Sequence, residues 1–149
     1  MLSIGENAPE FKAKDQNSQE VRLADFLGKK NVVLFFYPKD ETPGCTAEVC
    51  SFRDHYEQFS NLDTVIIGVN QASVETHKSF SERHALNFSI LHDEGNVIRK
   101  AYQVPNKFFI LPGRVTYVID KQGKIAAAIN DMFNAERHIK ETLAFLNKH

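Results

Sequence analysis

Two continuous apolar segments dominate the hydrophobic pattern of the chain, and each is typical of a buried strand. Residues 31–37 read Asn-Val-Val-Leu-Phe-Phe-Tyr, and residues 64–70 read Thr-Val-Ile-Ile-Gly-Val-Asn. Both segments are rich in β-branched and aromatic side chains, which favour strands. Neither alternates between apolar and polar positions, so we expect both to be central strands that are covered on both faces.

A helical pattern lies between these two strands. Apolar side chains recur there at spacings of four, three, four and three, which places them on one face of a helix. They are Cys45, Val49, Phe52, Tyr56 and Phe59. A strand, a helix and a second strand in this order form a unit whose two strands run parallel. The helix face that carries Cys45 is therefore expected to pack against the sheet.

Three shorter elements are expected after the second strand. A helix is predicted over residues 73–84, with Ser73 as its N-cap. Residues 88–91 favour a short strand, and residues 96–102 favour a short helix. These elements continue the alternation of strands and helices that is typical of an α/β protein.

The C-terminal part predicts a hairpin followed by a helix. Residues 115–120 and 125–129 are apolar and flank a short turn, in which Gly123 supplies the conformation that an antiparallel hairpin needs. Asn134 then caps a final helix. The apolar stripe of that helix consists of Ile139, Leu143 and Leu146.

Length and composition indicate one ordinary globular domain. The chain has 149 residues, which is within the usual size of one domain, and 42% of them are hydrophobic. No internal repeat, low-complexity tract or linker divides the sequence. We therefore expect a single domain over residues 1–149, of the α/β class, with a central mixed sheet flanked by helices.

Charge and hydropathy exclude several classes of partner. Eighteen Lys and Arg residues against 19 Asp and Glu residues give a net charge of −1, without the basic excess of a nucleic-acid or anionic-membrane binder. No segment approaches the roughly 20 apolar residues of a membrane helix. Residues 1–10 contain no readable secretory signal, so we expect a cytoplasmic protein with reduced cysteines, a trimmed organelle-targeting peptide being the alternative.

Both cysteines lie in the segment of residues 37–50, which runs from the end of a strand into a helix. Thr42 followed by Pro43 is typical of a helix start, and the Thr42 hydroxyl is expected to accept from the amide of Gly44 or Cys45. Cys45 then falls in the first helical turn. Unpaired backbone N–H groups and the positive end of the helix dipole favour the thiolate over the thiol there.

Other features oppose the thiolate, so a fixed cation is expected beside Cys45. Burial on the apolar stripe and the neighbouring Asp40 and Glu41 carboxylates all disfavour a negative sulfur. The helix dipole contributes only about 0.3–1 kcal/mol, less than the roughly 1.4 kcal/mol that corresponds to a tenfold change in the thiolate ratio. Arg114, just before the strand of the hairpin, is the best candidate for the cation, and Arg53 is the second.

Cys50 lies five residues after Cys45, and helix geometry limits what this pair can do. Five residues of ideal helix separate two Cα atoms by roughly 8.7 Å, whereas a disulfide needs about 4.4–6.8 Å. A disulfide therefore requires the first turns of the helix to unwind. His55 follows at the same spacing, but successive rotations of about 140° place the three side chains on different faces, so no metal site is expected.

The pattern Pro38-x-x-x-Thr42-x-x-Cys45 resembles the active-site motif of the peroxiredoxin family, in the fuller form that is found in its bacterioferritin-comigratory or Q-type branch. The similarity extends over nearly the whole chain and includes residues 5–11, 23–29 and 114–120. Residues 104–113 form a shorter connection than in many members of the family, which bears on the shape of the pocket and the preferred peroxide.

The resemblance implies a thioredoxin-like fold and a thiol peroxidase. Cys45 would be the peroxidatic cysteine and Cys50 the resolving one, and the two would form an intramolecular disulfide. Thr42 and Arg114 would orient the peroxide and stabilise the thiolate, while Pro38 would shape and shield the pocket. The implied substrates are hydrogen peroxide and alkyl hydroperoxides, and the implied reductant is thioredoxin or a related dithiol. The branch is commonly monomeric, and the reaction requires no metal or organic cofactor.

Other readings of the two cysteines remain open. A thiol-disulfide oxidoreductase is disfavoured because such sites usually carry Cys-x-x-Cys, and four residues separate Cys45 from Cys50 here. A peroxide-sensing binding domain would use the same unwinding to present a new surface to a partner. A cysteine on an apolar helix face is also, by itself, most often a packed core residue.

Overall fold

The two apolar segments form the middle of a five-stranded mixed sheet. β3 (Asn31–Phe36) pairs parallel with β4 (Thr64–Asn70), and β5 (Ser89–His92) continues in parallel beyond β4. On the other side, β8 (Val115–Ile119) runs antiparallel to β3, and β9 (Ile125–Asn130) runs antiparallel to β8. The order is β5-β4-β3-β8-β9, which confirms the expected mixed sheet with β3 at its centre.

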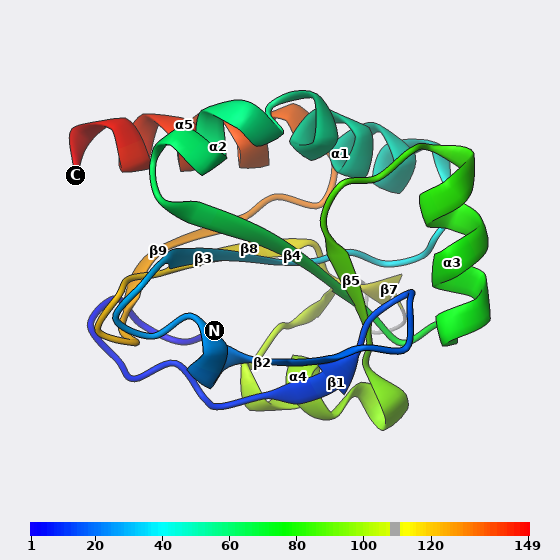
Figure 1. The fold of residues 1–149 in the computed structure, drawn as a ribbon, viewed down its shortest axis with the longest axis horizontal. Coiled ribbons are helices and arrows are strands. Elements are labelled where there is room, and N and C mark those ends of the chain that lie inside the picture. The colour runs from blue at the N-terminus through cyan, green and yellow to red at the C-terminus, as the bar shows by residue number, and fades with distance from the viewer. Residues whose placement is uncertain (108–110) are drawn as a thin grey trace.

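Helices cover one face of this sheet. The computed structural model describes residues 1–107 and 111–149, and Figure 1 shows α1, α2 and α5 above the sheet and α3 beside it. Their bounds are α1 Pro43–Asp54, α2 Tyr56–Asn61, α3 Val74–Arg83 and α5 Ala135–Lys148. Two of the predicted caps are confirmed, because Ser73 accepts from the Thr76 amide and Asn134 accepts from the Arg137 amide.

The single helix expected after residue 42 is wrong, because α1 and α2 are separate helices with a break at His55. The backbone of His55 leaves the helical region, with φ −100° and ψ 8°, and its ring Nδ1 lies 2.7 Å from the Ser51 carbonyl oxygen. The break turns Tyr56 away from the sheet and leaves it 37% exposed, whereas the other four members of the apolar stripe are buried.

The opposite face is covered by short elements, most of which the sequence pattern does not reveal. Figure 1 shows β1, β2 and α4 below the sheet. The short elements are β1 (Lys12–Lys14), β2 (Glu20–Arg22), η1 (Leu23–Asp25), η2 (Glu94–Asn96), α4 (Val97–Ala101), β6 (Asn106–Lys107) and β7 (Leu111–Pro112). β1 and β2 form an antiparallel hairpin of three residues per strand, too short for a periodic signal.

The core has two parts, one on each face of the sheet. Val33 and Phe35 of β3 belong to the apolar cluster under α1, α2 and α5, and Phe35 stacks on Phe52 with ring centroids 4.5 Å apart. Leu34 and Phe36 belong to the cluster on the other face. Because successive side chains of a strand point to opposite faces, this double burial explains the continuous apolar run.

Candidate active site

The loop that leaves the central strand delivers Cys45 to the start of a helix that packs on the sheet. β3 ends at Phe36, α1 begins at Pro43, and Cys45 is the third residue of α1. The first helical hydrogen bond runs from the Thr46 amide to the Thr42 carbonyl, at 2.8 Å. The backbone N–H groups of the first turn therefore have no partner within the helix. The side chain of Cys45 is almost fully buried, with 1% exposed.

Thr42 is the N-cap residue, but its side chain does not cap the helix as expected. The hydroxyl donates to the carbonyl oxygen of Lys39 at 2.8 Å instead of accepting from the Gly44 or Cys45 amide. The loop turns back over itself, so a backbone carbonyl lies within reach of the hydroxyl proton. The hydroxyl oxygen thereby keeps its lone pairs for another donor.

Arg114 brings a cation to the sulfur from the adjacent strand. It directly precedes β8, the neighbour of β3, and its side chain is buried. Its Nη2 donates to Cys45 Sγ at 3.3 Å, its Nη1 to Glu48 Oε1 at 2.7 Å, and its Nε to the Met132 carbonyl at 3.1 Å. Burial acts to lower the pKa of Arg114, but Glu48 and Cys45 together hold it above its ordinary value.

The other cation considered from the sequence points elsewhere. Arg53 donates through Nε to the carboxylate of Asp54 and through Nη1 to the carbonyl oxygen of His84. The family resemblance singled out five residues. Among the described parts of the chain, residues 1–107 and 111–149, the structure joins two of these five by a side-chain hydrogen bond, Cys45 and Arg114.

Gly44 lies beside Arg114, a closeness that the sequence reasoning did not identify. A Cβ atom at this residue would lie 3.3 Å from Arg114 Nη2, tighter than an ordinary contact. The absence of a side chain therefore lets the guanidinium approach the start of α1. A glycine inside the first helical turn, where glycine is unfavourable by roughly 1 kcal/mol relative to alanine, was the available signal.

Glu48 is the second position that sequence reasoning missed. Its carboxyl group is fully buried, and this burial raises its pKa to about 7 although Arg114 acts to lower it. Oε1 accepts from Arg114, whereas Oε2 has no hydrogen-bond partner among the described residues. A charged residue three positions after Cys45, close to the apolar face of the helix, was the signal in the sequence.

His138 lies beside the Glu48 oxygen that has no hydrogen-bond partner in the described part of the chain, with its Nδ1 3.7 Å from Glu48 Oε2. Its Nε2 donates to the Asp131 carbonyl at 2.7 Å, while Nδ1 accepts from the Thr116 hydroxyl at 2.8 Å. Burial lowers the pKa of His138. The ring is therefore neutral and supplies no cation to Glu48, which leaves Arg114 as the charge shared by Glu48 and Cys45.

The raised pKa of Glu48 predicts a pH-dependent stability that glutamine removes. Between the ordinary pKa of 4.5 and about 7 the folded chain holds a proton that the unfolded chain has lost, so stability falls as the pH rises. The contribution of Glu48 to the free energy of unfolding is complete below pH 4.5 and is lost above pH 7, a change of about 3 kcal/mol. The measurement is urea unfolding of the reduced protein over this pH range. The free energy of unfolding of the wild type minus that of Glu48→Gln should decline by this amount as the pH rises. A difference that does not change with pH would contradict the raised pKa of Glu48.

Cys50 and Pro38 make no hydrogen bond to Cys45 or Arg114 in the described residues. Cys50 is half-buried in the same helix as Cys45, and both thiols are free. Because α1 is intact across both residues, the pair cannot form a disulfide in this conformation. Pro38 is half-buried, and its carbonyl accepts from Asn70 Nδ2 at 3.0 Å.

The connection of residues 104–113 is held at its two ends. Arg99 donates to the carbonyl oxygens of Pro105 and Gly113, at 3.2 and 3.5 Å. Residues 108–110 lie outside the described residues. The expectation that this connection alters the shape of the pocket therefore stays a prediction.

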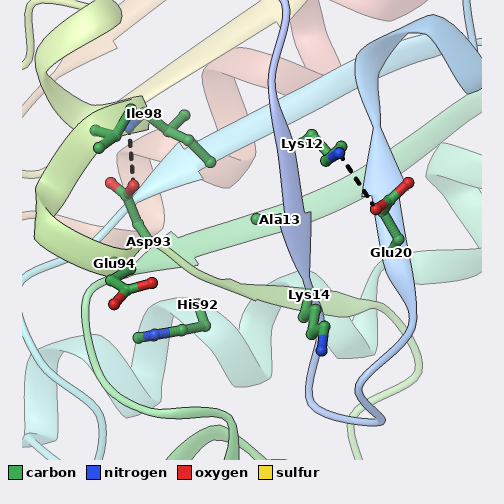
Figure 2. A pocket seen from close by; sticks show the side chains of 9 residues that line it. Lys12, Ala13, Lys14, Glu20, His92, Asp93, Glu94 and Ile98 are labelled. Carbon is green, nitrogen blue, oxygen red and sulfur yellow. Dashed lines mark hydrogen bonds and ion pairs between the residues drawn. The ribbon is translucent and has the colours of Figure 1, made fainter.

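A separate hollow of about 540 Å³ lies between β1, β2 and the connection from β5 to α4 (Figure 2). Three of its charged groups already serve the fold. Asp93 accepts from the backbone amides of Ile98 and Arg99, and Lys12 pairs with Glu20 at 3.7 Å. The hollow is lined from elements other than α1 and its preceding loop, so it is distinct from the cysteine site.

Two absences concern residues 1–107 and 111–149, the part of the chain that the structure describes. Within these ranges, no three side chains of His, Cys, Asp or Glu are arranged so that they could hold a metal ion. No helix in the same ranges has the length and apolar character needed to cross a membrane.

The chain matches known proteins over nearly its whole length. The model of the AhpC/TSA family matches residues 4–128. The chain is similar to the chloroplastic peroxiredoxin Q of Sedum lineare, with 47% identity over 146 residues that cover 97% of this chain and 78% of the relative. The chloroplastic peroxiredoxin Q of Arabidopsis thaliana is 48% identical over 97% of this chain and 67% of its own.

Solved structures give the same result. The peroxidoxin BcpB of Mycobacterium tuberculosis superposes with a TM-score of 0.91 and 30% identity, covering 99% of this chain and 98% of that one. The bacterioferritin comigratory protein of Xanthomonas campestris, whose structure was described in relation to alkyl peroxide reduction, gives a TM-score of 0.86 and 26% identity over 93% of this chain and 91% of that one.

These relatives correct one expectation. The cytoplasmic location inferred from the sequence is wrong, because the similar peroxiredoxins Q are named chloroplastic, which points to an organelle. A thiol site of this kind is compatible with either compartment. Composition and cysteine count therefore did not distinguish the two locations.

Proposed function

We propose a residue-level catalytic cycle for this chain, which belongs to the AhpC/TSA family and, within it, to the Q-type peroxiredoxins. The chain is a thiol peroxidase that acts on peroxides and is recycled by a thioredoxin-type reductant. In the proposed cycle Cys45 is the peroxidatic cysteine and Cys50 the resolving one. The observation that carries this assignment is the 3.3 Å hydrogen bond from Arg114 Nη2 to Cys45 Sγ in the first turn of α1.

The first step is attack of the Cys45 thiolate on one oxygen of the peroxide. A sulfur–oxygen bond forms, the oxygen–oxygen bond breaks, and the departing oxygen takes a proton from solvent to leave as water or an alcohol. The sulfur is oxidised to sulfenic acid, and the peroxide is reduced by the same two electrons. Hydrogen peroxide and alkyl hydroperoxides share this reacting group, and the work on alkyl peroxide reduction in the Xanthomonas relative supports the second class.

The groups around the sulfur have separate roles in this step. Arg114 and the backbone N–H of Cys45 stabilise the thiolate and the negative charge that develops on the departing oxygen. The Thr42 hydroxyl, whose proton is donated to Lys39, accepts the hydrogen bond of the peroxide O–H and so orients it. Pro38 shields the pocket from water.

The second step joins the two cysteines of α1. The Cys50 sulfur attacks the sulfenic sulfur of Cys45, a disulfide bond forms, and the sulfenic oxygen leaves as water with the proton of the Cys50 thiol. The first turns of α1 unwind to let the two sulfurs meet. A dithiol of the thioredoxin type then reduces the disulfide and is itself oxidised to a disulfide.

Replacement of Cys50 by serine separates these steps and tests the cycle. The variant is expected to reduce one equivalent of peroxide per chain and then to stop, because the sulfenic acid has no internal thiol to attack it. Peroxide loss in the presence of thioredoxin and its reductase measures turnover, and trapping of the sulfenic acid with a dione reagent followed by mass spectrometry locates the oxidised sulfur. Sustained turnover of this variant at the wild-type rate is incompatible with the resolving role.

We also propose that residues 1–149 act as one domain and that the chain works as a monomer, without a nucleic-acid or membrane partner. The position of both cysteines in one helix supports the monomer, because the disulfide then needs no second subunit. The net charge of −1 argues against a polyanionic partner. The electrons pass between sulfur and peroxide, so the cycle needs no metal or organic cofactor.

A further inference from the structure

A buried ion pair lies under the loop that leads to Cys45 and has no part in the cycle described above. Asp40, in that loop, is 4% exposed, and His77, on α3, is fully buried. Their side chains meet with His77 Nδ1 2.7 Å from Asp40 Oδ2. Charged groups are rarely buried unless they are paired, so this contact calls for a structural or functional reason.

The surroundings of His77 indicate that both of its ring nitrogens carry protons. Nδ1 faces the carboxylate of Asp40, and Nε2 lies 3.2 Å from the carbonyl oxygen of Asn70. Both partners act as acceptors, and a neutral imidazole has only one N–H to offer. The charged ring satisfies both contacts and makes the bond to Asp40 a charge-assisted one.

Two further side chains extend this pair along the loop. The Tyr37 hydroxyl donates to Asp40 Oδ1 at 2.5 Å, and burial together with the Asp40 charge raises the pKa of Tyr37, so the hydroxyl keeps its proton. Asn70 donates through Nδ2 to the carbonyl oxygens of Tyr37 and Pro38, at 2.8 and 3.0 Å. The loop is thus bonded at Tyr37 and Pro38 to the end of β4, and at Asp40 to α3.

We propose that the His77–Asp40 pair is a positioning device for the peroxidatic site: it ties the loop of residues 37–40 to α3, so that Pro38 and Thr42 lie correctly beside Cys45. The pair also marks the point up to which the chain stays folded when α1 unwinds. This inference rests on the proposed cycle, because the cycle requires the helix start to unwind and to return to the same geometry in every turnover.

The contrast between the two sides of Asp40 supports this boundary. On its N-terminal side the loop is held by the buried bonds of Asp40 and Asn70. On its C-terminal side Glu41 is exposed, adopts a positive φ of 66°, and pairs with Arg83 and His84 at the surface. Exposed pairs contribute little to stability, so the contacts of Glu41 oppose unwinding only weakly, whereas the buried bonds of Asp40 hold the residues before it.

The kinetic test compares two variants that differ in the link to α3. In Asp40→Asn the amide oxygen accepts from the Tyr37 hydroxyl and the amide NH2 group donates to Nδ1 of a neutral His77, so the link to α3 is kept without a buried charge. Asp40→Asn/His77→Leu removes the link and leaves no charge unpaired. In a Cys50→Ser background, the rate constant for Cys45 oxidation is expected to fall at least about tenfold in the double variant relative to Asp40→Asn, because misplacement of reacting groups is costly. Equal rate constants in the two folded proteins overturn the proposal.

A matched control addresses the exposed contact in the same loop. Arg83→Gln breaks the surface pair with Glu41 and is expected to change the oxidation rate constant by less than about twofold. If Arg83→Gln lowers the oxidation rate constant as much as Asp40→Asn/His77→Leu does, the proposal is contradicted, because the loss of any contact to the loop would then have the same effect. Disappearance of oxidation in Cys45→Ser checks the proposed function separately: turnover without Cys45 would remove the cycle itself.

The boundary is tested in the wild-type chain and does not depend on a variant folding. Nitrogen-15 histidine spectra are expected to place protons on both ring nitrogens of His77, in the reduced protein and in the disulfide form. The signals that disappear in Asp40→Asn/His77→Leu are those of His77. Persistence of the charge-assisted N–H signal in the disulfide form supports the boundary at Asp40. Loss of that signal on oxidation, with return on reduction, overturns it.

Discussion

Cys45→Ser is expected to reduce peroxide turnover to the uncatalysed background, a loss on the order of 10³-fold or more. The nucleophile of the cycle is a thiolate, and a serine hydroxyl at the same position stays protonated and reacts poorly with a peroxide. The Arg114 guanidinium remains in place in this variant, so the pocket keeps its charge and loses its reacting atom. The measurement is peroxide loss with thioredoxin and its reductase, under conditions in which the wild-type chain is fully recycled.

The matched control is the second cysteine of the same helix. Cys50→Ser introduces the same chemical change five residues later and retains one oxidation per chain. The comparison separates loss of a nucleophile from any general effect of serine in α1. Residual turnover of Cys45→Ser above a small fraction of the wild-type value, with the sulfenic acid found on Cys50, would move the peroxidatic role away from Cys45.

Arg114→Gln is expected to lower the rate constant of Cys45 oxidation by about 10²-fold to 10³-fold, the usual cost of removing one donor from a site where negative charge develops. The guanidinium donates to the sulfur at 3.3 Å and supplies the buried cation beside it. Without it, burial and the neighbouring carboxylates disfavour the thiolate. Single-turnover oxidation of Cys45 at one fixed pH should show the slower reaction.

A second change is needed to separate chemistry from folding in this experiment. Arg114→Gln alone leaves the Glu48 carboxyl group buried without its cation, which destabilises the fold. Arg114→Gln/Glu48→Gln removes both charges, so it should recover stability but not the oxidation rate. Arg53→Gln is the surface control, because Arg53 contacts Asp54 and His84 and is expected to alter the rate by less than about twofold. A double variant with wild-type reactivity would exclude Arg114 from the chemistry.

The sheet and its main helices could be predicted from local patterns, and the errors have local causes. The runs over 31–37 and 64–70 became the parallel pair β3 and β4 because continuous burial leaves a continuous apolar signal. The break at His55 was missed because the apolar spacing continues through it, although the backbone changes direction there. The hairpin of β1 and β2 was missed because strands of three residues have too few positions to display a period.

The candidate site was predictable only in part. The motif around Cys45 indicated which residue types meet at the helix start, and the position of Arg114 before a strand suggested a cation from outside α1. The direction of the Thr42 hydroxyl was not predictable, because it depends on where the Lys39 carbonyl lies once the loop is folded. The closeness of Gly44 to Arg114 likewise appears only when β8 is placed beside β3.

By itself, the sequence determined the order of the five strands of the main sheet, the presence of a cysteine at a helix start and the need for that helix to unwind before a disulfide forms. These features depend on periodicity, helix geometry and covalent spacing, which act over a few residues. The tertiary structure alone decided that Glu48 shares the buried space of Arg114, that His77 pairs with Asp40, and that Arg114 and not Arg53 is the cation beside Cys45. Burial strengthens each of these electrostatic contacts, and burial is a property of several packed elements together and not of any one segment.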